Sequence, residues 1–102
     1  MEQVTAHILI EGRVQGVGYR YFTLQNGQHL GLFGWVCNLT DGRVEVLCQG
    51  SKQNIDLLVE KLRQGPSRSD VTDLTCKILT NGVSLKTQFE ITPTKEQVWR
   101  SF

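Results

Sequence analysis

The chain has 102 residues, of which 39% are hydrophobic and 21% charged, a composition typical of one soluble globular domain with a single core. Its 11 basic and 10 acidic residues give a formal net charge of +1, which excludes the strongly basic surface of a protein that binds nucleic acid or an anionic membrane. No run approaches the roughly 18 apolar residues of a membrane span.

The first predicted element is a strand followed by a loop rich in glycine. Apolar and polar residues alternate over residues 4–10 and predict a half-buried strand with His7 on its solvent face. The stretch EGRVQGVGYRYF at residues 11–22 then holds Gly12, Gly16 and Gly18. Glycine at this density weakens both strands and helices, so the backbone there serves a purpose other than regular structure.

A helix is predicted next, over residues 20–31, with Thr23, Gly27 and Leu30 on one face and Gly31 at its end. An Asn-Gly pair inside this range is also typical of a hairpin turn, but the flanking residues lack the alternation of strands. Gly27 costs such a helix about 1 kcal/mol relative to Ala, and it lets the helix lie close to a sheet.

A hairpin follows the first helix. Two strand-like runs, residues 33–38 and 43–49, are joined by a short turn that contains Asp41-Gly42. Alternate residues of the second run divide between two faces, with Val44, Val46 and Cys48 on one face and Arg43, Glu45, Leu47 and Gln49 on the other.

The remaining elements complete a recognisable order. Ser51 is the predicted N-cap of a second helix, whose apolar residues recur at i, i+3, i+4 and i+7 from Ile55 until Gly65-Pro66 ends it. Looser alternation predicts strands over residues 74–78 and 85–91. The order β-α-β-β-α-β plus one further strand predicts an α+β fold, the ferredoxin-like α/β sandwich, with two helices on one face of an antiparallel sheet.

The domain is expected to span residues 1–92. Residues 93–102 form a tail that carries Trp99 and Phe102, and we expect it to pack on the same domain. The alternative is a tail that binds a partner.

Cysteines and histidines bear on location and metals. The opening residues MEQVTAHILIEG lack the basic and apolar regions of a secretory signal, so we expect a cytoplasmic location. Cys37, Cys48 and Cys76 form neither a disulfide framework nor a CxxC pair and are expected to be small buried or half-buried hydrophobes. His7 and His29 have no Cys or carboxylate at ligand spacing, so no metal and no cofactor is predicted.

The glycine loop is suited to holding an anion. A strand that runs through glycines into a helix N-terminus turns backbone N–H groups inward, and the helix end adds partial positive charge. The planar guanidinium of Arg20 can donate to two phosphate oxygens at once. The loop lacks the Lys-Ser/Thr of a Walker A loop and the spacing of GxGxxG, so the glycines alone do not predict a nucleotide site.

Three stretches carry a resemblance to a known family. GRVQGVGYR resembles the acylphosphatase signature GxVQGVxFR, with Tyr19 in place of Phe and with matches at Gly12, Val14, Gln15, Gly16, Val17 and Arg20. GWVCNLTDGRVEVLCQG resembles the second motif of that family through Gly34, Trp35, Asn38, Gly42 and Val44. GPSRSDV resembles its GPxxAxV turn, with Ser69 where Ala is usual. The resemblance covers roughly residues 4–92 and implies the same α/β sandwich.

The resemblance also implies an activity and a site. It implies hydrolysis of a small-molecule acyl phosphate to a carboxylate and inorganic phosphate. Asn38 would position the attacking water, and the phosphate would be bound by Arg20 and the loop amides of Gln15, Gly16, Val17, Gly18, Tyr19 and Arg20. The carboxylate leaving group, with a pKa of about 4, departs without a general acid, and phosphoryl transfer asks mainly for positioning and charge stabilisation.

Two of the departures from the family pattern lie in or beside the expected site residues. Tyr19 adds a hydroxyl that must find a partner. Cys37 stands beside Asn38, where the family often has a basic or polar residue, but neighbouring strand residues point to opposite faces. We therefore expect Cys37 to be inert in the chemistry.

Two functions other than the enzyme are compatible with parts of this sequence. A regulatory or accessory domain could bind a phosphorylated ligand without turnover, because acylphosphatase-like modules also occur inside larger carbamoyl-transfer proteins, where the fold and motif can serve in other contexts. Domains with βαββαβ order also bind RNA through aromatics on two central strands, but residues 4–10 include none. The presence of both Arg20 and Asn38 favours the enzyme, and we expect a monomer with no nucleic-acid or membrane partner.

Overall fold

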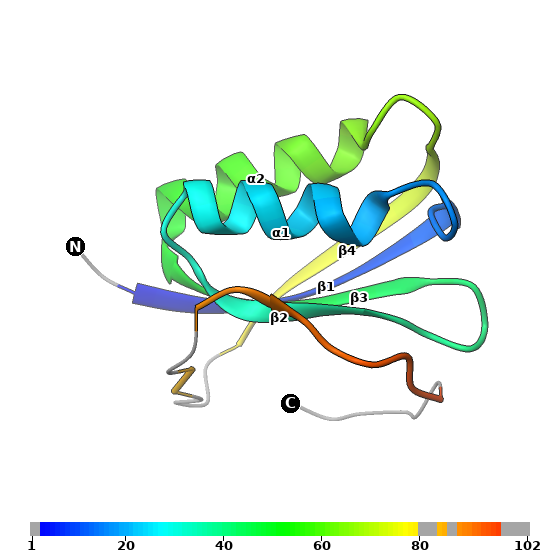
Figure 1. The fold of residues 1–102 in the computed structure, drawn as a ribbon. Helices are drawn as coiled ribbons and strands as arrows, with labels where there is room; N and C mark the ends of the chain where they lie inside the picture. The colour runs from blue at the N-terminus through cyan, green and yellow to red at the C-terminus, as the bar shows by residue number, and fades with distance from the viewer. Residues whose placement is uncertain (1–2, 80–83, 86–87, 97–102) are drawn as a thin grey trace.

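The computed structural model describes residues 3–79, 84–85 and 88–96. Trp99 and Phe102 lie outside the described residues, so the prediction for the tail beyond residue 96 stays a prediction. The elements, which Figure 1 shows, are β1 (Gln3–Arg13), α1 (Tyr19–His29), β2 (Phe33–Asn38), β3 (Val44–Ser51), α2 (Lys52–Gln64), β4 (Asp70–Leu79) and β5 (Glu90–Ile91).

The strands form one sheet in the order β4-β1-β3-β2-β5. Neighbours among the first four strands are antiparallel, which confirms the ferredoxin-like α+β prediction. β5 differs from the expected antiparallel sheet, because it pairs parallel with β2 through Trp35–Glu90 and Val36–Ile91. The sheet is therefore mixed, and its fifth strand is a short addition to the outer edge of β2.

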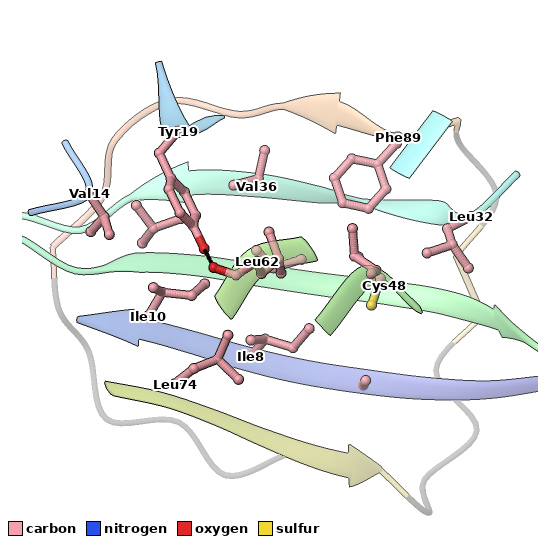
Figure 2. Packing of buried hydrophobic residues seen from close by; sticks show 14 of the residues in the cluster. Ile8, Ile10, Val14, Tyr19, Leu32, Val36, Cys48, Leu62, Leu74 and Phe89 are labelled. Atoms are coloured by element: carbon pink, nitrogen blue, oxygen red, sulfur yellow. Dashed lines mark hydrogen bonds between the residues drawn. The ribbon is translucent and has the colours of Figure 1, made fainter. Parts of the chain in front are cut away.

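Both helices cover one face of the sheet, with the main core beneath them (Figure 1). The predicted stripe of α2 is confirmed, since Ile55, Leu58 and Leu62 are all fully buried. α1 begins one residue earlier than predicted and buries Tyr19, Thr23 and Gly27, whereas Leu30 is half-buried. Figure 2 shows this core from close by, with side chains from both helices over the strands.

The opposite face of the sheet is less open than the sequence suggests. Glu45 and Leu47 lie on that face of β3, and each is only 4% exposed. His7, predicted to face solvent, is half-buried and lies 2.6 Å from Glu45, Nε2 to Oε2. Residues after β5 continue along the outer edge of β2, and on this face Lys95 Nζ lies 4.2 Å from the ring centroid of Trp35.

The cysteine prediction holds for two residues of three. Cys37 and Cys48 are buried, but Cys76 is exposed because it lies on β4 at the edge of the sheet. No helix among the described residues is long and apolar enough to cross a membrane.

Candidate active site

The glycine loop between β1 and α1 leaves several backbone donors free. Gly16 and Gly18 have φ values of 72° and 80°, a left-handed conformation that residues with a Cβ rarely adopt. Gly18 is the N-cap of α1, and no side chain caps that helix end. Within the described part of the chain, no backbone amide of residues 15–18 donates a hydrogen bond. The first turn of the helix adds further N–H groups without an intrahelical acceptor.

A surface pocket of about 220 Å³ lies at this loop. Gly16, Gly18 and Arg20 line one part of it, and Val14, Tyr21 and Ile91 contribute apolar surface. Arg20 is half-buried and forms no ion pair or hydrogen bond with any other described residue. The pocket therefore combines a free guanidinium with the positive end of a helix, which suits a phosphate group with an organic substituent.

Gln15 ties the glycine loop to the β2–β3 hairpin. Its Nε2 donates to the carbonyl oxygens of Leu39 at 2.8 Å and Arg43 at 2.9 Å. The side chain of Gln15 is thus engaged in structure, and only its backbone amide is available for an anion. The two hydrogen bonds also bring the loop to the end of β2, since Leu39 directly follows Asn38.

Asn38 is the last residue of β2 and lies on the face covered by the helices. It pairs with Val44, a core residue of β3, so the two share that face. The Oδ1 atom of Asn38 is buried and has no hydrogen-bond partner among the described residues. A buried amide oxygen without a partner is costly, so this atom is an acceptor suited to a bound water or ligand.

The adjacent thiol takes no part in this arrangement. Cys37 is paired with Glu45 and points to the opposite face, with Sγ 4.0 Å from Glu45 Oε1. The prediction that Cys37 and Asn38 face opposite sides is confirmed.

Comparison with known proteins identifies the family and the fold. The family model for acylphosphatase matches residues 6–91. A protein named acylphosphatase from Acaryochloris marina is 52% identical over 64 residues, which cover 63% of this chain and 69% of that protein. The chain belongs to the acylphosphatase family. The names of its relatives and the shared fold identify this chain as an acylphosphatase enzyme, a hydrolase.

Solved structures extend the comparison. The crystal structure of acylphosphatase from Bacillus subtilis matches with a TM-score of 0.83 and 36% identity, over 87% of this chain and 98% of that one. Full-length HypF in its phosphate- and nucleotide-bound form matches with a TM-score of 0.84 and 27% identity, over 93% of this chain but 12% of that one. The acylphosphatase fold therefore occurs both as most of a chain and as a small part of a longer one.

Tyr19 departs from the acylphosphatase signature, and its hydroxyl has a structural partner. It donates to the carbonyl oxygen of Leu62 at 2.7 Å, a bond drawn in Figure 2. Burial raises the pKa of the Tyr19 phenol, so the group stays protonated and acts as a donor. Tyr19 and the buried Val17 can thus offer only backbone amides to an acyl phosphate.

Sequence reasoning missed a polar cluster behind Asn38, on the far face of the sheet. Glu45 Oε1 lies 2.6 Å from Lys95 Nζ, while its Oε2 lies 2.6 Å from His7 Nε2. Burial alone would raise the pKa of Glu45, but hydrogen bonds from His7 and Lys95 and the charge of Lys95 lower it to about 2. The one available signal was a carboxylate inside the apolar run of β3, since Lys95 is distant in the sequence.

Among the described residues, no group of three or more His, Cys, Asp and Glu side chains is arranged to hold a metal ion.

Proposed function

We propose that this acylphosphatase cleaves the carboxyl-phosphate bond of acyl phosphates without a metal, with Arg20 and Asn38 as its catalytic side chains. Arg20 and the backbone amides of residues 15–20 hold the phosphoryl group, and Asn38 orients the attacking water. The buried Oδ1 of Asn38 carries this proposal, because it has no partner among the described residues and lies at the end of β2, where Gln15 ties the glycine loop to the carbonyl oxygens of Leu39 and Arg43. We further propose that the protein is a cytoplasmic monomer.

The loop and Arg20 would bind the charge of the phosphoryl group throughout the reaction. Donors fixed by the fold at developing charge lower the barrier without reorganisation, and removal of one such donor typically costs about 3 kcal/mol. Gly16 and Gly18 support this role, because their left-handed backbone leaves the neighbouring amides without acceptors. The free guanidinium of Arg20 adds a fork that matches two phosphate oxygens.

Asn38 would fix the line of attack. Its Oδ1 accepts a hydrogen bond from water, which leaves a lone pair of the water oxygen free to approach phosphorus. The new P–O bond forms as the bond to the acyl oxygen breaks, and that electron pair leaves on the carboxylate. Because a carboxylate has a pKa of about 4, it departs without protonation, and the water protons remain with inorganic phosphate.

A phosphate-binding domain without turnover is the second candidate. The match to a small part of full-length HypF, described in its phosphate- and nucleotide-bound form, favours it. A binding domain requires the loop and Arg20 but gives no reason for an unpartnered acceptor at Asn38. The two candidates therefore differ in what Asn38 does.

The deciding experiment measures hydrolysis of benzoyl phosphate by the purified chain in excess EDTA. Arg20→Ala and Asn38→Ala are assayed beside it, with folding checked by circular dichroism. We expect Arg20→Ala to weaken inhibition by inorganic phosphate and to lower kcat/KM by about a hundredfold or more. Asn38→Ala should lower kcat about as strongly while phosphate inhibition is kept.

Each other outcome has a clear meaning. Binding of phosphate without turnover by the wild-type chain would establish the binding domain. Turnover that EDTA abolishes and a divalent cation restores would contradict the metal-free mechanism. Full activity in folded Asn38→Ala would remove that residue from the chemistry.

A further inference from the structure

The chain beyond the family match runs along the outer edge of β2. The match to the acylphosphatase model ends at residue 91, whereas the described segment continues to residue 96. Thr92 N donates to the carbonyl oxygen of Val36 at 2.9 Å, and Lys95 N donates to that of Asn38 at 3.1 Å. Thr40 N in turn donates to the carbonyl oxygen of Lys95 at 3.0 Å. In Figure 1 this segment, coloured orange to red, passes β2 on the side away from β3.

Asn38 is therefore held from two sides. β3 pairs with it at Val44 on one edge, and the backbone of Lys95 bonds to it and to Thr40 on the other edge. The pairing of the Lys95 backbone with Asn38 and Thr40 is not part of a long strand, because β5 has only two residues. Short strand pairs are marginal by themselves, so something else must keep residue 95 in place.

The side chain of Lys95 supplies that anchor. Its Nζ lies 2.6 Å from Glu45 Oε1 and 4.2 Å from the ring centroid of Trp35. Glu45 is only 4% exposed and is fixed further by His7. The Lys95 side chain is 27% exposed, but the carboxylate that it contacts is buried, so opening this contact leaves Glu45 with one partner fewer in a desolvated place. A cation over an indole ring adds to it.

We propose that Lys95 is a positioning residue for Asn38, which it holds from outside the part of the chain that defines the family. The inference rests on the proposed function, since it assigns Lys95 to the orientation of the water-binding side chain. The backbone of Asn38 fixes the direction of its Cα–Cβ bond and thus the place of Oδ1. A shift of about 1 Å in a positioning group can cost about a hundredfold in rate. Loss of the contact between Lys95 and Glu45 thus lowers turnover, while Arg20 and the backbone amides of residues 15–20 still bind phosphate.

The first test compares full-length Lys95→Met with Lys77→Met, which makes the same change at an exposed lysine of β4. Folded variants are assayed with benzoyl phosphate, with inorganic phosphate as the competing ligand. We expect Lys95→Met to lower kcat about tenfold and to keep the phosphate inhibition constant. Lys77→Met should match the wild type. Lys95→Arg should recover most of kcat, because it keeps a cation beside Glu45.

A second readout does not depend on turnover. The side-chain amide of Asn38 gives NMR signals that are assigned by their loss in Asn38→Asp, and the backbone amide of Thr40 reports the bond to Lys95 by its hydrogen exchange. In Lys95→Met the Asn38 signals should move and the Thr40 amide should exchange faster. Neither should change in Lys77→Met.

The outcomes separate this inference from the proposed function. Wild-type kcat in folded Lys95→Met, with unmoved Asn38 signals, overturns the inference alone. A loss of kcat with an equal weakening of phosphate inhibition also overturns it, because the damage is then general. If the wild-type chain hydrolyses no acyl phosphate, the proposed function fails and the NMR comparison decides whether Lys95 holds Asn38. If Lys95→Met does not fold, Glu45→Gln is measured instead and must show the same loss of kcat with phosphate inhibition kept.

Discussion

Among single residues, Tyr19 shows how a change from the family signature is accommodated. Its hydroxyl donates to the carbonyl oxygen of Leu62, in the last turn of α2. That carbonyl would normally accept from the amide four residues later, but position 66 is Pro, which has no N–H. Tyr19 therefore supplies the donor that Pro66 lacks, and it links the glycine loop to the second helix.

Replacement of this phenol tests the link. We expect Tyr19→Phe to lower the free energy of unfolding by about 1–3 kcal/mol, because a buried carbonyl loses its partner. Tyr21→Phe removes a hydroxyl from a side chain that is 59% exposed and should change that free energy by less than about 0.5 kcal/mol. Urea unfolding followed by circular dichroism measures both. Equal losses in the two variants would contradict the role given to Tyr19.

At the level of elements, α1 lies against Phe89, just before β5, as well as against the rest of the sheet. A Cβ on Gly27 would lie 2.6 Å from Cδ2 of Phe89, whose ring is only 2% exposed. The sequence predicted a close approach of this helix at Gly27, and the structure identifies the contact as the Phe89 ring beside β5. Spacing along the helix marks which face is buried, but it carries no information about which distant residue covers that face.

The same reasoning explains how much of the fold could be predicted. The hairpin at Asp41-Gly42 and the stripe of α2 follow from local patterns, and both helices lie where these patterns place them. The parallel pairing of β5 and the contact of Lys95 with Glu45 depend on residues far apart in the chain. No local pattern specifies such contacts. The pairing of the Lys95 backbone with Asn38 and Thr40 could therefore not be predicted from the sequence.

Gly27→Ala tests the contact with Phe89. Ala favours a helix by about 1 kcal/mol, but overpacking against a buried ring costs about 1–3 kcal/mol, so we expect a net loss of stability. In a Phe89→Leu background the clash is relieved, and the same substitution should become neutral or stabilising. Thermal or urea unfolding of the four proteins gives both differences. A stabilising Gly27→Ala in the wild-type background would show that the ring gives way freely.

For the molecule as a whole, the two faces of the sheet bury side chains of different kinds, apolar on one face and largely polar on the other. The helices bury an apolar core on one face, whereas the other face buries Glu45 with His7, Lys95 and Trp35. Asn38 lies at the end of a strand between these two layers. The polar layer therefore affects both the stability of the domain and the geometry of its site.

The polar cluster of Glu45, His7 and Lys95 makes the free energy of unfolding depend on pH. The pKa of Glu45 falls from the ordinary 4.5 to about 2 in the folded chain. The ionised carboxylate therefore adds to the free energy of unfolding above about pH 4.5, and this contribution is lost as pH falls toward about 2. We expect the free energy of unfolding to decline over this interval and the decline to be shallower in Glu45→Gln. Glu60→Gln, at an exposed position of α2, should keep the wild-type profile. Identical profiles for the two variants would contradict this assignment.

The strand order has a consequence for how a competent site comes into being. β1, which leads into the glycine loop, lies between β3 and β4, and β4 is supplied by the far half of the chain. The helices can form from local contacts, but the loop meets Asn38 only after pairings that close long stretches of chain have been made. A chain that has its helices but not its paired strands therefore lacks the contact between the glycine loop and the end of β2, and with it the proposed site.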